Sequence, residues 1–296
     1  MERKTKFHHY VEAVLIYALP WALRPLPFKW RVALGGAMIG GAVRLVPSLR
    51  KRIERNVALI FPDMANKKTF IKQVTRHIGR GFMVLFYSKD YHSKLSGVEM
   101  APDALAQIQA AQAAEKPVIV VSGHFGEWEA IRVMLARAGL PSASIYREAS
   151  NPIFERHFAK AMAVGGAGLF QTGMKGTRKM LKHLKAGGII TVLLDQRVNE
   201  GVPLDFLGHP ALSSTIMAEL AQKTGALLVP AYAPLAADGQ VQLVVEPALD
   251  HGNPLAMTQA INDSLSAQVR AHPEQWYWLH NRWARPDLTT SNPDLG

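Results

Sequence analysis

The stretch VIVVSGHFGEWEA, residues Val118–Ala130, joins a run of β-branched residues to a histidine in a glycine-rich turn. A short apolar run that ends in a turn before a helical pattern is typical of a buried parallel strand. Gly123 and Gly126 permit a tight turn and a close approach of a ligand to the backbone. The stretch therefore predicts that His124 stands at the mouth of a sheet, just before a helix.

The spacing of His124 and Glu129 restricts how their side chains could meet. Within one helix, five residues turn through about 500°, which leaves two side chains about 140° apart. The two can meet only if His124 lies in the turn and Glu129 lies on the first turns of the helix. His124 could then act as a general base whose tautomer is fixed by Glu129, or it could be a hydrogen-bonded structural residue.

Other reactive groups are scarce in this chain. It contains no cysteine, which excludes disulfides, thiolate nucleophiles and Cys-ligated zinc. A G-x-S-x-G elbow and an H-E-x-x-H zinc motif are also absent. GLFQTGMK (168–175) approaches a phosphate-binding loop but places Met174 where the lysine belongs. The remaining interpretation is that His124 deprotonates a substrate hydroxyl or amine, which then attacks an activated acyl group.

Strand and helix patterns alternate along most of the chain after about Ser96, and the part before it is expected to be helical. The expected strands are Pro117–Ser122, Ser142–Tyr146, Gly188–Leu194, Ala226–Ala233 and Val241–Glu246. The expected helices are Glu127–Ala138, Pro152–Val164, Gly176–Lys185, Ser214–Thr224 and Met257–Ala271. This alternation predicts an α/β fold with a mixed, largely parallel sheet flanked by helices.

Two apolar stretches, Tyr10–Leu23 and Val32–Val43, follow the basic start of the chain. Each is shorter than the roughly 20 residues that span a bilayer, and no A-x-A site predicts a removable signal peptide. One interpretation is a helical membrane-associating segment with four side chains at the interface: Trp21, Trp30, Arg24 and Lys29. The alternative is a buried helical hairpin packed on the core. The basic cluster Leu49–Arg55 favours the membrane, because basic clusters bind anionic cytoplasmic leaflets.

The charge balance narrows the class of partner. Among 296 residues, Lys+Arg 34 against Asp+Glu 23 gives a formal net charge of +11. This charge suits nucleic acid, acidic lipid head groups or an acidic carrier protein. No helix-turn-helix, RNP or zinc-finger pattern supports nucleic acid, so a nucleic-acid partner is not expected.

Six sequence blocks follow one another in a fixed order. They are RKRIERNVALIFPD (50–63), GHFGEWE (123–129), YREASNP (146–152), LKAGGIITVLLDQRVNEGVPLDFLGHPALSS (184–214), LAQKTGALLVP (220–230) and PEQWYWLHNRWARP (273–286). Together they resemble the bacterial lipid A late acyltransferase family, with GHFGEWE similar to its H-x4-D/E signature. The resemblance covers nearly the whole chain.

That resemblance implies roles for particular residues. His124 would be the general base, Glu129 its orienting carboxylate and Asp195 the aspartate of the DQ block, although Asp195 could instead cap a turn. Backbone N–H groups around Gly123 to Gly126, or a nearby cation, would stabilise the oxyanion. No cofactor or metal is implied. The implied substrate-binding residues are Gly126, Arg147, Gln196 and Arg197, of which Arg147 could equally be a surface charge.

Two positions depart from the lipid A pattern. The family places a functional arginine near the position of Val164, where this chain reads KAMAVGGAG, and it often has an acidic residue where Arg197 stands. Both departures concern the part of the site that would bind the acceptor. Arg156 and Lys160 lie nearby without matching the family arginine. The basic run Lys175–Lys185 could dock an acidic carrier or form a solvated helix face.

The expected protein is a membrane-associated O-acyltransferase at the cytoplasmic face of a bacterial inner membrane. Its donor would be a thioester of acyl carrier protein or coenzyme A, and its acceptor a lipid hydroxyl, with a lipid A precursor as the leading candidate. The alternatives are another envelope lipid or metabolite as acceptor, a thioesterase, and a non-catalytic membrane-surface binder. The expected division is a membrane-associating segment at 1–48, an acyltransferase domain at 49–290 and a frayed tail at 291–296.

Overall fold

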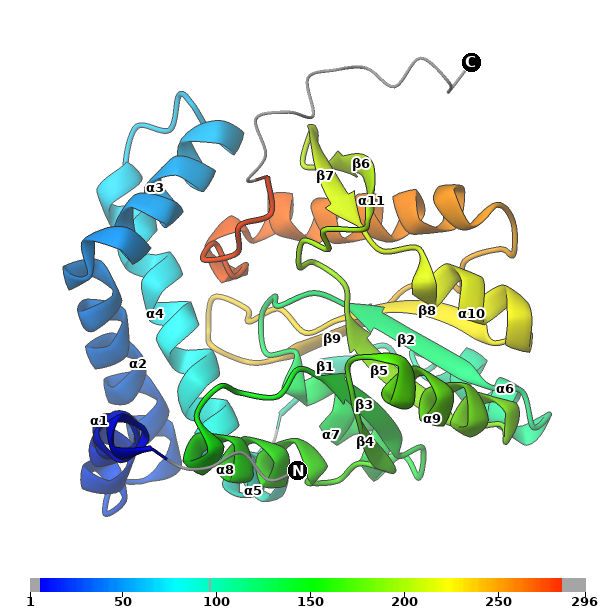
Figure 1. The fold of residues 1–296 in the computed structure, drawn as a ribbon, viewed down its shortest axis with the longest axis horizontal. Helices are drawn as coiled ribbons and strands as arrows, with labels where there is room; N and C mark the ends of the chain where they lie inside the picture. The colour runs from blue at the N-terminus through cyan, green and yellow to red at the C-terminus, as the bar shows by residue number, and fades with distance from the viewer. Residues whose placement is uncertain (1–5, 96, 284–296) are drawn as a thin grey trace.

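A central sheet with helices on both faces forms the body of the protein (Figure 1). The structure, a computed structural model, describes residues 6–95 and 97–283. The expected frayed tail, 291–296, lies outside these residues.

The sheet is mostly parallel and has seven strands in the order β1-β9-β8-β2-β5-β3-β4. The parallel strands are β8 (Leu227–Tyr232), β2 (Val118–Ser122), β5 (Ile189–Leu193), β3 (Ser142–Tyr146) and β4 (Gly168–Gln171). At the other edge, β9 (Gln242–Val245) is antiparallel to β8, and β1 (Glu99–Met100) is parallel to β9. The predicted mixed, largely parallel α/β sheet is confirmed, whereas β1 and β4 were not expected.

Two layers of helices cover the sheet because the strands are apolar on both faces. All five residues of β2 are buried, and the four apolar ones alternate between two hydrophobic clusters. One face packs against α4 (Lys67–Phe86), α5 (Ser88–Lys94), α6 (Ala106–Ala113) and α7 (Glu129–Arg137). The other face packs against α9 (Met174–Lys185), α10 (Ile216–Thr224) and α11 (Pro254–Ala271). The helices predicted between the strands are thus confirmed to within a few residues at each end.

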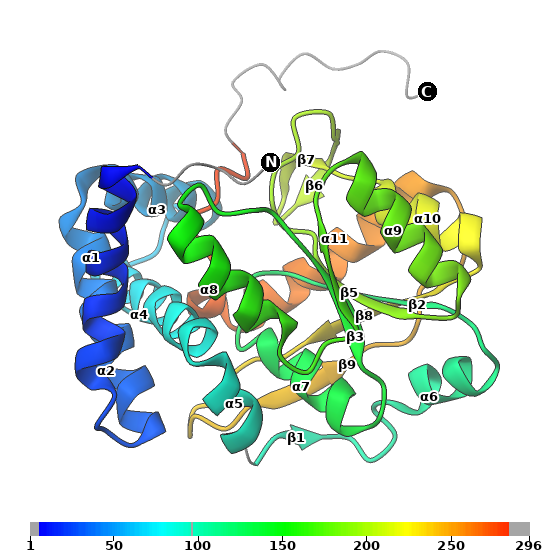
Figure 2. The same cartoon turned by 60° about the horizontal axis from the view of Figure 1, so that its bottom comes forward.

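The N-terminal helices form a separate layer at one end of the molecule (Figure 2). They are α1 (Phe7–Leu23), α2 (Phe28–Leu45) and α3 (Pro47–Ile60), and α8 (Pro152–Ala163) lies between them and the sheet. Helix α2 packs closely on α4, since a Cβ added at Gly79 would lie 2.4 Å from the carbonyl oxygen of Gly36. Within the described residues, no single helix is long and apolar enough to cross a bilayer; α2 and α3, bent by 92°, pass that test only as a pair.

A third cluster of buried side chains closes the carboxyl end of the sheet. The hairpin of β6 (Val202–Phe206) and β7 (His209–Ser213) and the short 3-10 helix η1 (Pro273–Gln275) contribute to this end. The cluster joins α3, α4, the hairpin and the C-terminal segment through large aromatic and aliphatic side chains: Val57, Phe70, Phe206, Trp276 and Trp278. It holds residues 276–280 against the turn that follows β2.

Candidate active site

The turn after β2 fixes the backbone of His124. The carbonyl oxygen of His124 accepts a hydrogen bond from the N–H of Tyr277 at 2.9 Å. Gly126 has φ +59°, and a Cβ at this position would lie 2.3 Å from the carbonyl oxygen of Ala233. A glycine is therefore required here for the packing of the turn on the end of β8, and the substrate contact expected of Gly126 stays a prediction.

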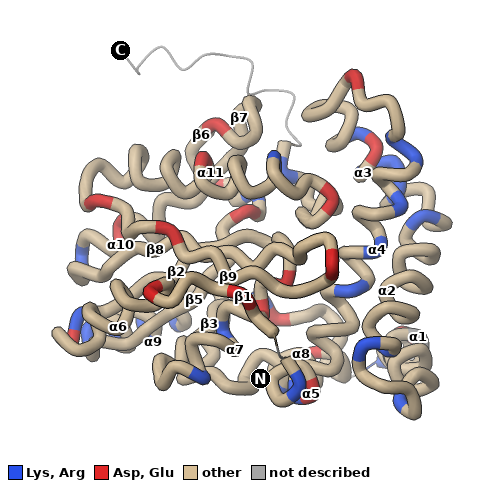
Figure 3. The backbone as a smooth tube through the Cα atoms, turned by 180° about the vertical axis from the view of Figure 1, so that it is seen from behind, with Lys and Arg blue, Asp and Glu red and all other residues tan. Residues whose placement is uncertain are grey.

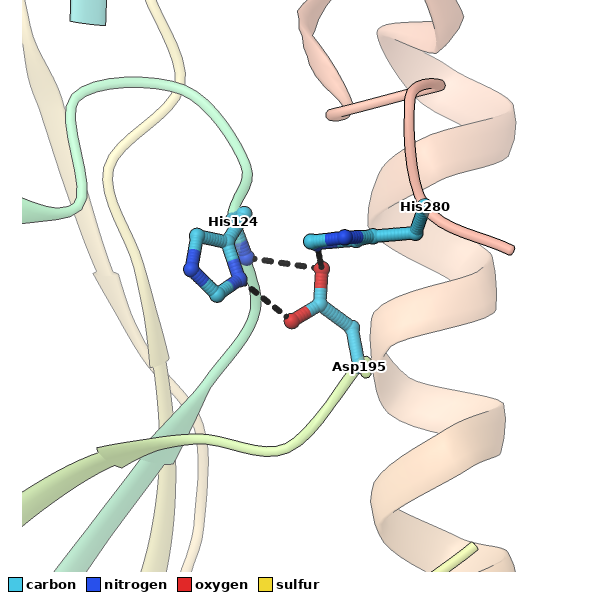
Figure 4. A group of neighbouring side chains, drawn as sticks. All are labelled: His124, Asp195 and His280. Carbon is cyan, nitrogen blue, oxygen red and sulfur yellow. Dashed lines mark hydrogen bonds and ion pairs between the residues drawn. The ribbon is translucent and has the colours of Figure 1, made fainter. Parts of the chain in front are cut away.

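Asp195 is the carboxylate that contacts His124 (Figure 4). Its Oδ1 lies 2.8 Å from His124 Nδ1, and its Oδ2 accepts the backbone N–H of His124 at 2.9 Å. Trp276 donates its indole N–H to the same Oδ2 at 2.9 Å. An ionised carboxylate can only accept hydrogen bonds, so His124 Nδ1 must carry the proton that it donates to Oδ1. The lone pair of the imidazole is then on Nε2, which points away from Asp195 (Figure 4).

The register of the sheet brings these two residues together. Strands β2 and β5 are adjacent and parallel, with Ser122 opposite Leu193. His124 and Asp195 each stand two residues beyond that pair, so they meet at the carboxyl edge. Ligands of open α/β sheets bind at this edge, which agrees with the position predicted for Asp195.

Asp195 is held as an anion. Its side chain is fully buried, which opposes ionisation, but the neighbouring His124 and His280 hold the pKa of this carboxyl well below its ordinary value. An ionised carboxylate at Nδ1 stabilises the imidazolium that forms when Nε2 takes up a proton. The pair can therefore act as a general base and then as a general acid.

His280 is a second imidazole in the site. Its Nε2 lies 3.6 Å from Asp195 Oδ2, and its ring centroid lies 4.8 Å from that of His124. Burial lowers the pKa of His280, although Asp195 opposes this effect. Burial therefore favours the neutral form of His280, whose ring lies beside the dyad.

Glu129 does not pair with His124, contrary to the sequence-based expectation. Its Oε1 accepts hydrogen bonds from His92 Nε2 and Arg132 Nη1, each at 2.8 Å. As the first residue of α7, Glu129 points toward α5 and α8, away from the edge where Asp195 lies. The carboxylate partner of His124 is thus corrected to Asp195, and any catalytic role of Glu129 stays a prediction.

Arg132 links Glu129 to the position where the family pattern departs. Its Nη2 donates to the carbonyl oxygens of Met162 at 2.6 Å and Val164 at 3.2 Å. Both Glu129 and Arg132 are about 3% exposed. Arg132 therefore places a buried guanidinium at the backbone of Val164.

Three of the four backbone N–H groups expected as oxyanion donors are already engaged, as is that of Glu127. The N–H groups of His124 and Phe125 donate to the Asp195 carboxylate and to the carbonyl oxygen of Gly123. Those of Gly126 and Glu127 donate to the carbonyl oxygens of Gln275 and Ala233. In this conformation they cannot bind an oxyanion. Donors for such a group would have to be the N–H of Gly123 or other groups at this edge.

The three remaining predicted residues lie at the same carboxyl edge. Arg147 is exposed one residue after β3, and Gln196 is exposed beside Asp195. Arg197 is partly buried and donates to Asn199 Oδ1 at 2.9 Å. Their position at the edge agrees with substrate binding, which stays a prediction.

Residues of the C-terminal block, for which the sequence predicted no individual roles, complete the site. Trp276 and His280 contact Asp195 directly. Arg282 is 1% exposed and donates to the carbonyl oxygen of Leu212 at 2.6 Å and to Ser213 Oγ at 2.7 Å, and burial lowers its pKa to about 10. It anchors β7 to the site. The one signal available was the block itself, which places aromatic, histidine and arginine residues at fixed spacing.

His124, Asp195 and His280 also have ligand atoms within 4.8 Å of one another, a spacing that could hold a metal ion. However, Asp195 already accepts three N–H bonds, and His124 Nδ1 is occupied by one of them. A cation would have to displace these bonds. The donor set therefore fits a hydrogen-bonded dyad better than a metal centre.

The fold and the site together define an α/β protein with a histidine–aspartate base at the carboxyl edge of a parallel sheet. A profile of the family described as "Bacterial lipid A biosynthesis acyltransferase" matches residues 1–285. The chain belongs to this family, which confirms the resemblance noted from the sequence blocks.

Individual relatives differ in what their names say they acylate. The chain is 24% identical to the lipid A biosynthesis lauroyltransferase of Escherichia coli (strain K12) over 282 residues, 90% of each chain. It is 22% identical to a lipid A biosynthesis acyltransferase of Haemophilus influenzae over 267 residues, 86% of this chain and 81% of that one. It is also 28% identical to the phosphatidylinositol mannoside acyltransferase of Mycobacterium tuberculosis (strain H37Rv) over 207 residues, 68% of this chain and 65% of that protein's length.

Proposed function

We propose that this protein transfers a fatty acyl chain from a thioester to a hydroxyl group of a membrane lipid, with a lipid A precursor as the leading acceptor. The observation that carries the proposal is the His124–Asp195 pair, in which Nδ1 is held at 2.8 Å by a buried carboxylate. This arrangement leaves Nε2 as a base at the edge of the sheet where a substrate can reach it. Family membership supports acyl transfer as the reaction.

The reaction needs one residue to move a proton twice. His124 Nε2 takes the proton of the acceptor hydroxyl as its oxygen attacks the thioester carbonyl. The tetrahedral intermediate then collapses, the C–S bond breaks, and His124 returns the proton to the leaving thiolate. The products are an ester and a free thiol. No covalent enzyme intermediate forms, in keeping with a chain that contains no cysteine.

A small hollow lies near the turn that carries His124, with room for only about one water molecule. It lies between α4 and the turn, and is lined by residues of both: Gly81, Val84, Leu85 and 126–129. The ring of Trp128 lies 5.5 Å from that of His124. An acyl chain could enter here only if the side chains of α4 and the turn moved apart.

The surface of α1 and α2 supports a lipid acceptor. On α2, the exposed side chains Trp30, Leu34, Met38 and Leu45 fall within about 80° of arc at 100° per residue. On α1, Tyr10, Val14 and Trp21 form a similar exposed stripe. Lys and Arg residues gather on the neighbouring α3 and α4 (Figure 3). Such a surface suits a helix pair that lies on an anionic bilayer, and we place the protein at the cytoplasmic face of the bacterial inner membrane.

An acyl-transfer assay tests the proposal. Purified protein in detergent is given an acyl-labelled carrier-protein thioester, or the coenzyme A thioester, together with lipid from a Gram-negative inner membrane. We expect label in a lipid product with the wild type, none with His124→Ala, and unchanged transfer with the control His8→Ala, which alters an exposed histidine on α1. Release of free fatty acid alone would assign a thioesterase instead, and near-normal transfer by His124→Ala would overturn the mechanism.

A further inference from the structure

Helix α9 has a strongly basic face. Its exposed cationic side chains fall within about 120° of arc at 100° per residue: Lys175, Arg178, Lys179, Lys182 and Lys185. The buried residues Gly176, Met180 and Leu184 lie on the opposite side, against the sheet. The helix sequence, MKGTRKMLKHLK, contains no acidic residue. It therefore presents a continuous positive surface along its length of about 18 Å.

This face begins at the edge of the sheet that holds the dyad. β4 ends at Gln171 and α9 starts at Met174, so the first turn of α9 lies at the carboxyl edge. Three strand steps separate β2, which carries His124, from β4, in the order β2-β5-β3-β4. At about 4.8 Å per step, the start of α9 lies about 14 Å along the edge from the strand of His124.

Arginines also follow the two strands between them. Arg197 comes after β5 and Arg147 after β3, and both lie at the carboxyl edge. Glu148 is a carboxylate in the same region, and its Oε1 accepts a hydrogen bond from Gln171 Nε2 at 2.5 Å. The path from α9 to His124 therefore carries two arginines, alongside Glu148 and Glu155, whose carboxylates accept hydrogen bonds within the protein.

We propose that the basic face of α9 docks a small acidic protein that carries the acyl thioester on a flexible phosphorylated arm. The acidic surface of the carrier would lie on α9, and the arm would run along the carboxyl edge past Arg147 to His124. Attraction between the basic face of α9 and an acidic carrier would raise the association rate and fix the orientation of the carrier. This inference rests on the proposed function, and it takes a carrier protein as the donor.

The structure favours a protein over a lipid surface as the partner of α9. The apolar stripes of α1 and α2 lie at one end of the molecule and α9 at the other (Figure 2). Peripheral helices bind bilayers through a buried apolar face as well as charge. Met174, 81% exposed at the start of the helix, is the one large apolar side chain that α9 exposes. A surface of this kind suits a hydrophilic, acidic partner.

Charge reversal on α9 tests the proposal without relying on turnover. The variant Arg178→Glu/Lys182→Glu removes two cations from the middle of the face. Its matched control is Lys89→Glu/Lys116→Glu, which makes the same charge change at exposed residues on α5 and before β2. Binding of fluorescent holo-acyl carrier protein to the full-length protein is measured by anisotropy at low and high salt.

We expect the α9 variant to raise the Kd for the carrier at least about 10-fold at low salt, and the control to change it less than about 2-fold. Added salt should weaken binding by the wild type more than by the α9 variant. Equal affinities of the wild type and the α9 variant would overturn the proposal. So would a loss of binding to phosphatidylglycerol vesicles with unchanged carrier binding, which would assign α9 to lipid.

Transfer assays separate this proposal from the proposed function. If α9 docks the carrier, the variant raises KM for the carrier thioester, with kcat and the rate with the coenzyme A thioester little changed. If carrier binding depends on α9 but neither thioester is consumed by the wild type, docking stands and the proposed function fails. If transfer from the carrier is unaffected by charge reversal, the docking surface fails and the proposed function stands.

Discussion

Replacing Asp195 by asparagine is expected to change the tautomer of His124 with little change in shape. Oδ2 of Asp195 accepts two N–H bonds, from His124 N and Trp276 Nε1, so the amide oxygen of asparagine must occupy that position. The amide nitrogen then takes the place of Oδ1, 2.8 Å from His124 Nδ1. Two donors cannot face each other, so Nδ1 must lose its proton and Nε2 must carry it.

In that tautomer, Nε2 cannot accept the proton of the acceptor hydroxyl. We expect kcat to fall about 10³- to 10⁴-fold, which corresponds to about 4–5 kcal/mol of barrier. Nitrogen NMR of the histidine rings should report the change from the Nδ1–H to the Nε2–H form. Asp263→Asn, on the exposed side of α11, serves as the matched control.

The assay is initial-rate acyl transfer at saturating thioester, with the melting temperature measured on the same samples. A folded Asp195→Asn protein that keeps more than about a tenth of the wild-type rate would refute the assignment of Asp195 as the partner of the base. So would an unchanged Nδ1–H tautomer accompanied by full loss of activity.

Three further predictions address the surroundings of the dyad. Glu129→Ala leaves the charge of Arg132 buried without its carboxylate partner, so the free energy of unfolding in urea should fall by about 3 kcal/mol. The double variant with Arg132→Leu should recover part of this stability. Additive losses from the two substitutions would contradict the pairing. Burial lowers the pKa of His77, His157 and His280, so the unfolded chain binds more protons below about pH 6.5. The melting temperature should therefore fall from pH 7 to pH 5, less steeply in His280→Asn, and a flat profile would contradict the burial. Chelation by EDTA should leave transfer unchanged, because the Asp195 carboxylate already accepts hydrogen bonds from N–H donors. A loss of transfer that one divalent metal reverses would instead show that His124, Asp195 and His280 bind a cation.

The sequence predicted the parts of the fold that carry strong local patterns. Strand β2 and strand β5 are runs of buried β-branched and aliphatic residues, and both were placed to within a residue at each end. β1 has two exposed residues and β4 has four that are only partly buried or exposed, so neither carries an apolar pattern. The hairpin β6–β7 was missed because Pro203 and Pro210 count against a strand, although β6 alternates regularly between exposed and more buried residues.

The partner of His124 could not be read from local spacing. H-x4-E places Glu129 near His124 along the chain, but the start of α7 directs that side chain to His92 and Arg132. Asp195 lies 71 residues away and reaches His124 because β5 is the neighbour of β2. Strand order is a property of the whole sheet, and spacing within one segment does not contain it. The resemblance to the family was what identified Asp195 in the sequence.

The close packing of α2 on α4 also bears on how the protein would meet a lipid. Gly36 and Gly79 bring the two backbones together, and further along α4, Gly81 lies against Trp128 and Arg80 pairs with Glu127 in the turn that holds His124. Helix α4 therefore connects the outer apolar stripe to the turn that holds the base. With the stripe resting on a bilayer, the height of His124 above the lipid plane would be set by this helix rather than by a flexible tether. Only acceptors whose hydroxyl stands at that height could be acylated without leaving the membrane.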